Sequence, residues 1–250
     1  MQKKWRIIKP QAFDAYMNMA LDEVICDGIK RGESAPTIRL YSWSPSAVSI
    51  GYFQGLDIEL NLKECRKQNI DYIRRRTGGG AVYHDSEGEL TYSLLCPEDL
   101  YPKGITESYA VICEYVVSAL ITLGLDATFA PINDILVDGK KISGNAQTRR
   151  GGVLQQHGTI LYDVDVDKMF SYLNVSKEKI ADKLIASVKK RVCCVKDFEG
   201  ISKEQVVDAL LAAFTAGKEW EYGDYTEKEL TLAKKLAIDK YKNPEWNNMR

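Results

Sequence analysis

The chain has 250 residues, of which 45% are hydrophobic and 28% are charged. This is the composition of a globular protein and excludes a disordered or fibrous chain. The 34 lysines and arginines nearly balance the 35 aspartates and glutamates, so the formal net charge is −1. That balance excludes a protein that grips a nucleic-acid backbone by bulk positive charge. No apolar run approaches the roughly 18 residues of a membrane-spanning helix, and no signal-like stretch follows the start, so we expect a cytoplasmic protein.

The predicted elements of the first half alternate between strands and helices. Strands are predicted over residues 5–9 (ended by Pro10), 37–43, 47–52 and 70–75, and helices over 14–30 and 61–68. Asn61 followed by Glu64 is typical of a helix N-cap, and Gly32 of a helix end.

The second half opens with the strongest helix pattern, residues 106–123, which Gly124 ends. Strands are predicted over residues 89–95, 135–137, 141–149 and 153–163, and Asp138-Gly139 predicts a type I′ hairpin turn. From about residue 165 the chain is predicted to be mainly helical, with capping boxes at Ser202 and Thr226. The pattern favours an α+β fold with mixed, largely antiparallel sheets flanked by helices, in a single domain over 1–250.

The cysteines and histidines argue against a metal-binding module. The chain has six cysteines, none in a CxxC pair, and two histidines, so a zinc ribbon or finger is excluded. We expect Cys65, Cys96 and Cys113 to be small buried hydrophobes and Cys193-Cys194 to be structural, with a redox role as the alternative.

One segment, residues 74–85, has a composition that is costly for folding alone. Three arginines precede Thr77, three consecutive glycines and then Ala81, Val82, Tyr83, His84 and Asp85. Glycines leave backbone N–H groups open to a phosphate or carboxylate, and arginines supply forked donors for the same anions. The alternative is a glycine-rich turn with solvated arginines.

Two further segments contain candidate ligand-binding residues. Lys141 lies in the predicted hairpin after Asn133 and Asp134, and a lysine that points inward there needs an anionic partner. Lys140 is expected to face solvent. His157, followed by Gly158 and Thr159, is either a core histidine or part of a ligand pocket. GxxxxGK[ST], GxGxxG and GxSxG motifs are absent.

At these residues the sequence resembles the lipoate–protein ligase A family, within the biotin/lipoate ligase superfamily. The similarity lies in residues 18–23, 51–54, 74–85 (RRxTGGGAVxHD), 89–93, 133–134, 140–144, 157–159, 191–192 and 241–246, in that order. The resemblance is to the split, archaeal-type form, in which a separate protein supplies the accessory C-terminal domain.

The resemblance implies a biotin/lipoate ligase-like fold and an ATP-dependent ligase that activates lipoate to lipoyl-AMP. The lipoyl group then passes to a lysine of a lipoyl-accepting domain, of the 2-oxoacid dehydrogenase E2 or glycine cleavage H protein type. ATP and Mg²⁺ are the implied cofactors, and a separate accessory subunit is an implied partner.

The family also implies roles for individual residues, with Lys141 as the catalytic residue that contacts both nucleotide and lipoate. The implied nucleotide-binding residues are Arg74, Gly79, Gly80, Ala81, Val82, Asn133, Asp134 and Lys141, with Asp134 as a candidate Mg²⁺ ligand. The implied substrate-binding residues are His84, Lys141, His157 and Thr159.

Two other functions remain open from the sequence. An octanoyl or lipoyl transferase on the same scaffold would work through a cysteine thioester, and we rank it lower because residues 125–140 and 151–163 contain no cysteine. A non-catalytic paralogue that binds lipoate or its adenylate is the second alternative.

Overall fold

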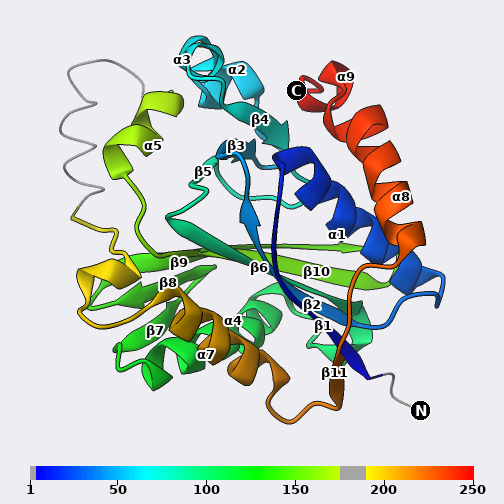
Figure 1. Cartoon of the computed structure of the whole chain (residues 1–250), viewed down its shortest axis with the longest axis vertical. Coiled ribbons are helices and arrows are strands. Elements are labelled where there is room, and N and C mark those ends of the chain that lie inside the picture. The colour runs from blue at the N-terminus through cyan, green and yellow to red at the C-terminus, as the bar shows by residue number, and fades with distance from the viewer. Residues whose placement is uncertain (1–3, 175–189) are drawn as a thin grey trace.

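The structure is a computed structural model and describes residues 4–174 and 190–250. An eight-stranded mixed sheet, in the order β11-β1-β2-β6-β10-β9-β8-β7, runs across the centre of the molecule. A second sheet, β4-β3-β5, lies beside it (Figure 1). The strands are β1 (Trp5–Phe13), β2 (Thr37–Trp43), β3 (Ala47–Ile50), β4 (Asp71–Arg74), β5 (Val82–His84), β6 (Glu89–Pro97), β7 (Ala127–Ala130), β8 (Asp134–Val137), β9 (Lys140–Arg150), β10 (Val153–Leu161) and β11 (Trp220–Tyr222).

Helices cover both faces of the large sheet. In Figure 1, α4 and α7 lie below the sheet and α1 and α8 lie above it. The helices are α1 (Ala15–Lys30), α2 (Leu56–Glu59), α3 (Leu62–Lys67), α4 (Ile105–Thr122), α5 (Val166–Tyr172), α7 (Lys203–Thr215), α8 (Glu227–Leu236) and α9 (Pro244–Asn247), with a π-helical turn at Ala237–Tyr241. The predicted α+β class is therefore confirmed.

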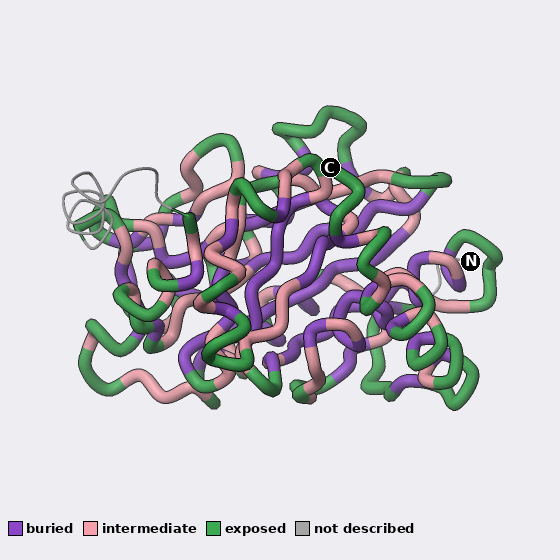
Figure 2. The backbone as a smooth tube through the Cα atoms, turned by 90° about the horizontal axis from the view of Figure 1, so that it is seen from above, coloured by how far each residue is buried: buried purple, intermediate pink, exposed green. Residues whose placement is uncertain are grey.

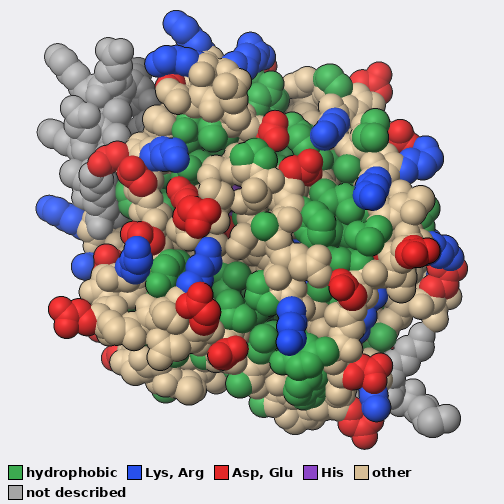
Figure 3. Space-filling model, viewed as in Figure 1, with side chains coloured by type: hydrophobic (Ala, Val, Ile, Leu, Met, Phe, Trp, Pro, Cys, Tyr) green, Lys and Arg blue, Asp and Glu red, His purple; other side chains and the backbone are tan. Residues whose placement is uncertain are grey.

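The alternation of the strands divides the core into two main clusters. Ile38 and Leu94 face the cluster under α4 and α7, whereas Tyr41 and Leu95 face the cluster under α1. This is the period of two that a strand imposes when both of its faces are covered. Figure 2 shows the resulting band of buried backbone through the centre of the sheet. Acidic and basic side chains are interspersed over the face seen in Figure 3.

Helix α4 is long and apolar enough to cross a membrane by length and composition. Its side chains Ile112, Val116 and Leu120 are fully or almost fully buried in the cluster that it shares with α7 and the sheet. A core helix passes the same test, and the packing of α4 is that of a core helix. The sequence analysis predicted this helix but stated that no apolar run approaches the length of a membrane span, and the length and composition of α4 correct that statement.

Several local predictions are confirmed. The side chains of Asn61, Ser202 and Thr226 cap α3, α7 and α8. Asp138 and Gly139 both have positive φ, as a type I′ turn requires. All six cysteines are buried and free.

Other predictions are wrong. Strand β1 continues through Pro10 to Phe13, because an irregularity between Ile8 and Gln11 accommodates the proline. The strand predicted over residues 47–52 ends at Ile50, and β2 and β3 belong to different sheets. Strands β5, β7 and β11, each of three or four residues, were not predicted from the sequence. Part of the predicted helical region after residue 165 lies outside the described residues.

Candidate active site

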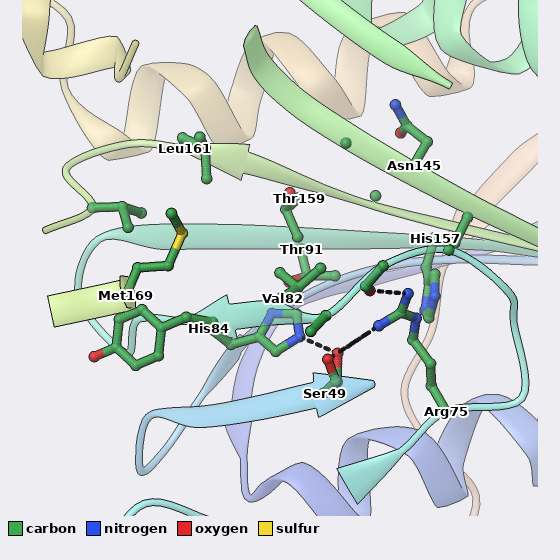
Figure 4. A pocket seen from close by; sticks show the side chains of 18 of the residues that line it. Ser49, Arg75, Val82, His84, Thr91, Asn145, His157, Thr159, Leu161 and Met169 are labelled. Carbon is green, nitrogen blue, oxygen red and sulfur yellow. Dashed lines mark hydrogen bonds between the residues drawn. The ribbon is translucent and has the colours of Figure 1, made fainter. Parts of the chain in front are cut away.

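A pocket of about 310 Å³ lies between the two sheets, in the size range of small-ligand sites. One end is polar and contains Arg75 and His157, and the other contains Leu161 and Met169 (Figure 4). The pocket is lined by Met19, Trp43, Ser49, Arg75, Gly79–Val82, Tyr83, His84, Thr91, Asn133, Lys141, Gly144–Ala146, His157–Thr159, Leu161, Val164, Val166, Met169, Leu173 and Val192.

Arg75 holds the glycine loop, residues 77–80, from the pocket side. Its Nη2 donates to the carbonyl oxygens of Gly78 (2.8 Å) and Gly80 (2.7 Å), and its Nε donates to Thr77 Oγ1 (3.1 Å). Its Nη1 donates to Ser49 Oγ at 3.0 Å. Burial lowers the pKa of this guanidinium to about 10, which leaves it positively charged at neutral pH. Arg75 forms no ion pair with any described residue, and its N–H groups bind Ser49, Thr77, Gly78 and Gly80, so it contributes an uncompensated positive charge to this end of the pocket.

His84 lies on β5 with both ring nitrogens engaged. Its Nε2 is 2.8 Å from Ser49 Oγ and its Nδ1 is 2.9 Å from Glu89 Oε1. Trp43 stacks on the ring with centroids 3.8 Å apart. Because Ser49 also accepts from Arg75, this chain of contacts extends from Glu89 on β6 to the glycine loop, and Figure 4 shows its part from His84 through Ser49 to Arg75.

His157 reaches the same loop from β10. Its Nε2 is 2.8 Å from Thr77 Oγ1, and its Nδ1 is 3.8 Å from Asp22 Oδ2 on α1. Burial lowers the pKa of His157, although Asp22 opposes the effect. Burial would raise the pKa of Asp22, but Arg39, His157 and Ser93 overcome it and the pKa is lowered. His157 is thus both a core histidine and a pocket residue, and the two readings of the sequence are compatible.

Lys141 points into the site from the start of β9. Its Nζ lies 2.6 Å from Asp134 Oδ1, and the two side chains are 39% and 36% exposed. A Cβ on Gly144 would lie 2.9 Å from that Nζ, so the ammonium sits directly over the glycine. We expected an inward-pointing Lys141 to need an anionic partner, and in the structure that partner is Asp134.

Asn133 and Asn145 join the start of β8 to β9. Asn133 Nδ2 donates to the Asn145 carbonyl oxygen (2.5 Å), and Asn145 Nδ2 donates to the Asn133 carbonyl oxygen (2.9 Å). Asn145 Oδ1 accepts from Tyr92 at 2.7 Å. Both asparagines line the pocket, but their side-chain amides bind the protein.

Arg74 does not lie in the pocket. Its side chain is fully buried and donates to the carbonyl oxygens of Gly51, Tyr52, Gln54, Trp246 and Asn247. Side chains on neighbouring strand residues point to opposite faces, so Arg75 faces the pocket where Arg74 cannot. The predicted contact of Arg74 with nucleotide phosphates is not what the structure provides, because its donors are occupied by backbone.

The structure brings together most of the residues predicted from the sequence. Gly79, Gly80, Ala81, Val82, His84, Asn133, Lys141, His157 and Thr159 line the pocket, and Asp134 joins them through Lys141. Sequence reasoning missed Arg75, Ser49, Asn145 and the apolar residues Leu161 and Met169. The three consecutive arginines at 74–76 indicate an anion-binding segment, but the sequence does not show which of the three faces the pocket.

None of the six cysteines, all in the described part of the chain, lines the pocket. Cys193 and Cys194 contact pocket residues from outside: the Cys193 N–H donates to the Lys141 carbonyl oxygen, and Cys194 Sγ accepts from the Val164 N–H. Burial raises the pKa of Cys193 to about 11 and also raises that of Cys194, so both thiols stay protonated at neutral pH.

Within residues 4–174 and 190–250, no group of three histidine, cysteine, aspartate or glutamate side chains is placed to hold a metal ion. Asp134, the candidate Mg²⁺ ligand, offers a single carboxylate, and this carboxylate is already paired with Lys141. ATP and Mg²⁺ stay predictions from the family resemblance.

A family model described as the lipoyl protein ligase A/B catalytic domain matches residues 14–215, which contain the entire pocket. The chain belongs to this family. It is accordingly an enzyme of the lipoate/biotin ligase superfamily, as the sequence motifs predicted.

Solved structures confirm the fold. The chain is similar to a bi-partite lipoate protein ligase of Thermoplasma acidophilum, with a TM-score of 0.89, 35% identity and coverage of 98% and 96% of the two chains. It is also similar to a lipoate-protein ligase A bound with ATP, with a TM-score of 0.85, 33% identity and 98% coverage of each chain.

Curated relatives correct the predicted activity. Proteins named octanoyltransferase LipM are 35% identical in Brevibacillus brevis (99% of this chain, 100% of the relative) and 36% identical in Clostridioides difficile (99% of each). The relative of that name in Staphylococcus aureus is 33% identical. The prediction of an ATP-dependent lipoate ligase is therefore wrong, and these relatives support the alternative of an octanoyl or lipoyl transferase. The absence of cysteines from residues 125–140 and 151–163 counts against a transferase only if the transfer passes through a cysteine thioester.

Proposed function

We propose that this chain transfers an octanoyl group from a carrier-protein thioester to the ε-amine of a lysine on a lipoyl-accepting domain. The observation that carries the proposal is the full-length similarity to octanoyltransferases, combined with a pocket that has one apolar and one cationic end. Such transfer belongs to protein lipoylation, the process to which the bi-partite ligase neighbour also belongs.

The apolar end of the pocket suits a medium-length acyl chain. Leu161, Val164, Val166, Met169 and Leu173 supply aliphatic or thioether side chains there. Each buried CH₂ of the acyl chain contributes about 0.8 kcal/mol to binding. With the chain in this end, the acyl carbonyl lies toward Gly144 and the Lys141 ammonium.

The polar groups match the charge that develops during transfer. When the acceptor amine attacks the thioester carbonyl carbon, negative charge forms on the carbonyl oxygen, and a positioned donor stabilises it. In this proposal Lys141 donates to that oxygen, and the charge of Arg75 adds to the positive potential. Asp134, 2.6 Å from the Lys141 Nζ, holds the ammonium in position.

Because no cysteine lines the pocket, the proposed transfer is direct. The acceptor nitrogen forms the amide bond as the carbon–sulfur bond breaks. The carrier leaves as a thiol after taking the proton that the amine loses. No acyl-enzyme on cysteine is formed.

The test is incubation of the protein with octanoyl-carrier protein and a lipoyl-accepting domain, without ATP. We expect the acceptor to gain the mass of one octanoyl group, and a Lys141→Ala variant to produce little gain. No gain, with binding of an octanoyl thioester intact, would contradict the proposal and favour a non-catalytic binding protein. A gain only from the free acid with ATP would also contradict it.

A further inference from the structure

A cluster of cationic and aromatic side chains lies on the outer side of the glycine loop. We call Arg76, Arg150, Lys240, Arg250, Tyr52 and Phe53 the cationic patch. Arg150 Nη2 donates to the Arg76 carbonyl oxygen at 3.3 Å. The Arg150 guanidinium lies 4.6 Å from the centroid of the Tyr52 ring, and that of Arg250 lies 5.1 Å from the Phe53 ring.

The patch carries more positive than negative charge. The carboxylate paired within it is Glu23, whose oxygens accept from Lys240 Nζ at 2.8 and 2.7 Å and lie 3.8 Å from Arg76 Nε. Arg150 and Arg250 form no ion pair with any described carboxylate. Arg76 and Lys240 share Glu23, and Asp27 also acts on Arg76, so Arg150 and Arg250 carry the uncompensated positive charge of the patch.

The exposed members of the patch have the chemistry of a binding surface. Arg150 and Arg250 are exposed, and Phe53 is 71% exposed although it is a large apolar residue. Arginine and tyrosine are enriched at protein interfaces, where they account for much of the binding energy. Stacking on the rings also limits the conformations of the two guanidinium groups before a partner arrives.

The patch is connected to the active site by backbone. The Tyr52 N–H donates to the Thr77 carbonyl oxygen at 2.8 Å, and Gly51 packs directly against the Gly79 carbonyl. Arg76 immediately precedes Thr77, the first residue of the glycine loop, and Arg75 binds this loop from the pocket side. A partner that binds the patch therefore docks beside the exposed glycines Gly79 and Gly80.

We propose that the cationic patch docks an acidic carrier domain, the protein that presents the acyl thioester. This inference rests on the proposed function, since it assigns the surface that receives the donor. Positive potential beside the pocket complements an acidic domain and increases its association rate.

The position of the patch favours the donor over the acceptor. The acceptor lysine has a short reach, so its domain has to bind close to the Lys141 ammonium. A carrier holds its thioester at the end of a long flexible arm. It can dock behind the loop while the acyl group extends over the glycines into the pocket.

The experiment compares wild type with an Arg150→Glu/Arg250→Glu double variant. Lys203→Glu is the control, because Lys203 begins α7 on the opposite face of the sheet (Figure 1). The KM for octanoyl-carrier protein is measured in parallel with turnover of octanoyl-pantetheine, a small thioester without a carrier domain. Binding of the carrier protein is also measured by fluorescence anisotropy at low and high salt, which requires no catalysis.

We expect the double variant to raise the KM and Kd for the carrier protein by about tenfold or more and to weaken their salt dependence. Turnover of octanoyl-pantetheine and the KM for the acceptor domain stay unchanged, as do all values for Lys203→Glu. Unchanged carrier binding, or an increased KM for the acceptor instead, would overturn the inference. If wild type transferred no acyl group from either thioester, the proposed function would fail, and the anisotropy measurement would still decide whether the patch binds the carrier.

Discussion

Lys141 Nζ and Asp134 Oδ1 are 2.6 Å apart, on the two strands of one hairpin, and Lys141 lines the pocket. Both side chains are about a third exposed, so the pair contributes little to folding. In the proposed transfer, the ammonium over Gly144 stabilises the negative charge that forms on the acyl carbonyl oxygen.

The first prediction concerns Lys141 itself. Lys141→Ala should lower kcat by about 10²–10³-fold, the usual effect of removing one donor to a developing oxyanion. The free energy of unfolding should change by no more than about 0.5 kcal/mol, because the residue is partly exposed. Lys140→Ala is the matched control, since the neighbouring lysine is exposed, and it should retain wild-type activity. Equal losses of activity and stability in Lys141→Ala would make Lys141 a structural residue.

The second prediction concerns the packing of Gly51 against the glycine loop. A Cβ on Gly51 would lie 2.0 Å from the Gly79 carbonyl oxygen, so Gly51→Ala has to displace the loop. A displacement of about 1 Å is expected to cost about 100-fold in kcat/KM. In the control Gly55→Ala, the atoms closest to the new Cβ all belong to the exposed Ile58 side chain, with Cδ1 nearest at 2.9 Å, and this side chain can move. If both variants had the same activity, the loop would have no part in the reaction.

The third prediction is a pH dependence of stability that depends on His157. Its pKa in the folded protein is below the usual value of 6.5, mainly because of burial. As pH falls below 6.5 the unfolded state takes up a proton that the folded state resists, so stability decreases toward acid pH. We expect urea unfolding to show lower stability at pH 5.5 than at pH 7.5, and a smaller difference in His157→Gln. An identical difference in both proteins would show that other groups cause it.

The fourth prediction concerns the cysteines. Because Cys193 and Cys194 are buried outside the pocket and protonated at neutral pH, the native protein should react slowly with iodoacetamide. A Cys194→Ala variant should keep wild-type transfer activity, and urea should expose all six thiols to the reagent. An octanoyl group found on any cysteine of the enzyme during turnover would refute direct transfer.

The sequence predicted the long elements of the fold because each has a strong local signal. Helix α4 has a continuous apolar side, and β8 and β9 flank a turn whose two residues both adopt positive φ. Pairing between distant segments was not predictable: the sequence does not show that β2 and β3 join different sheets.

The candidate site was predicted in composition but not in geometry. The glycine loop, Lys141 and His157 are recognisable as motifs, and the structure brings them to one pocket. Arg74 and Arg75 could not be told apart, because only the strand's orientation decides which guanidinium faces the pocket and which binds the carbonyls near Trp246. The choice between ligase and transferase could not be made from shared motifs either, since both chemistries stabilise charge at an acyl carbonyl.

The most direct measurement is a single-turnover experiment with carrier protein bearing a radiolabelled octanoyl group, excess enzyme, an acceptor domain and no nucleotide. The label is followed by rapid quench on the carrier, the enzyme and the acceptor. We predict that it passes from carrier to acceptor lysine in one phase, without accumulating on the enzyme. Label that stays on the carrier in the presence of folded enzyme would contradict octanoyl transfer as the function of this site.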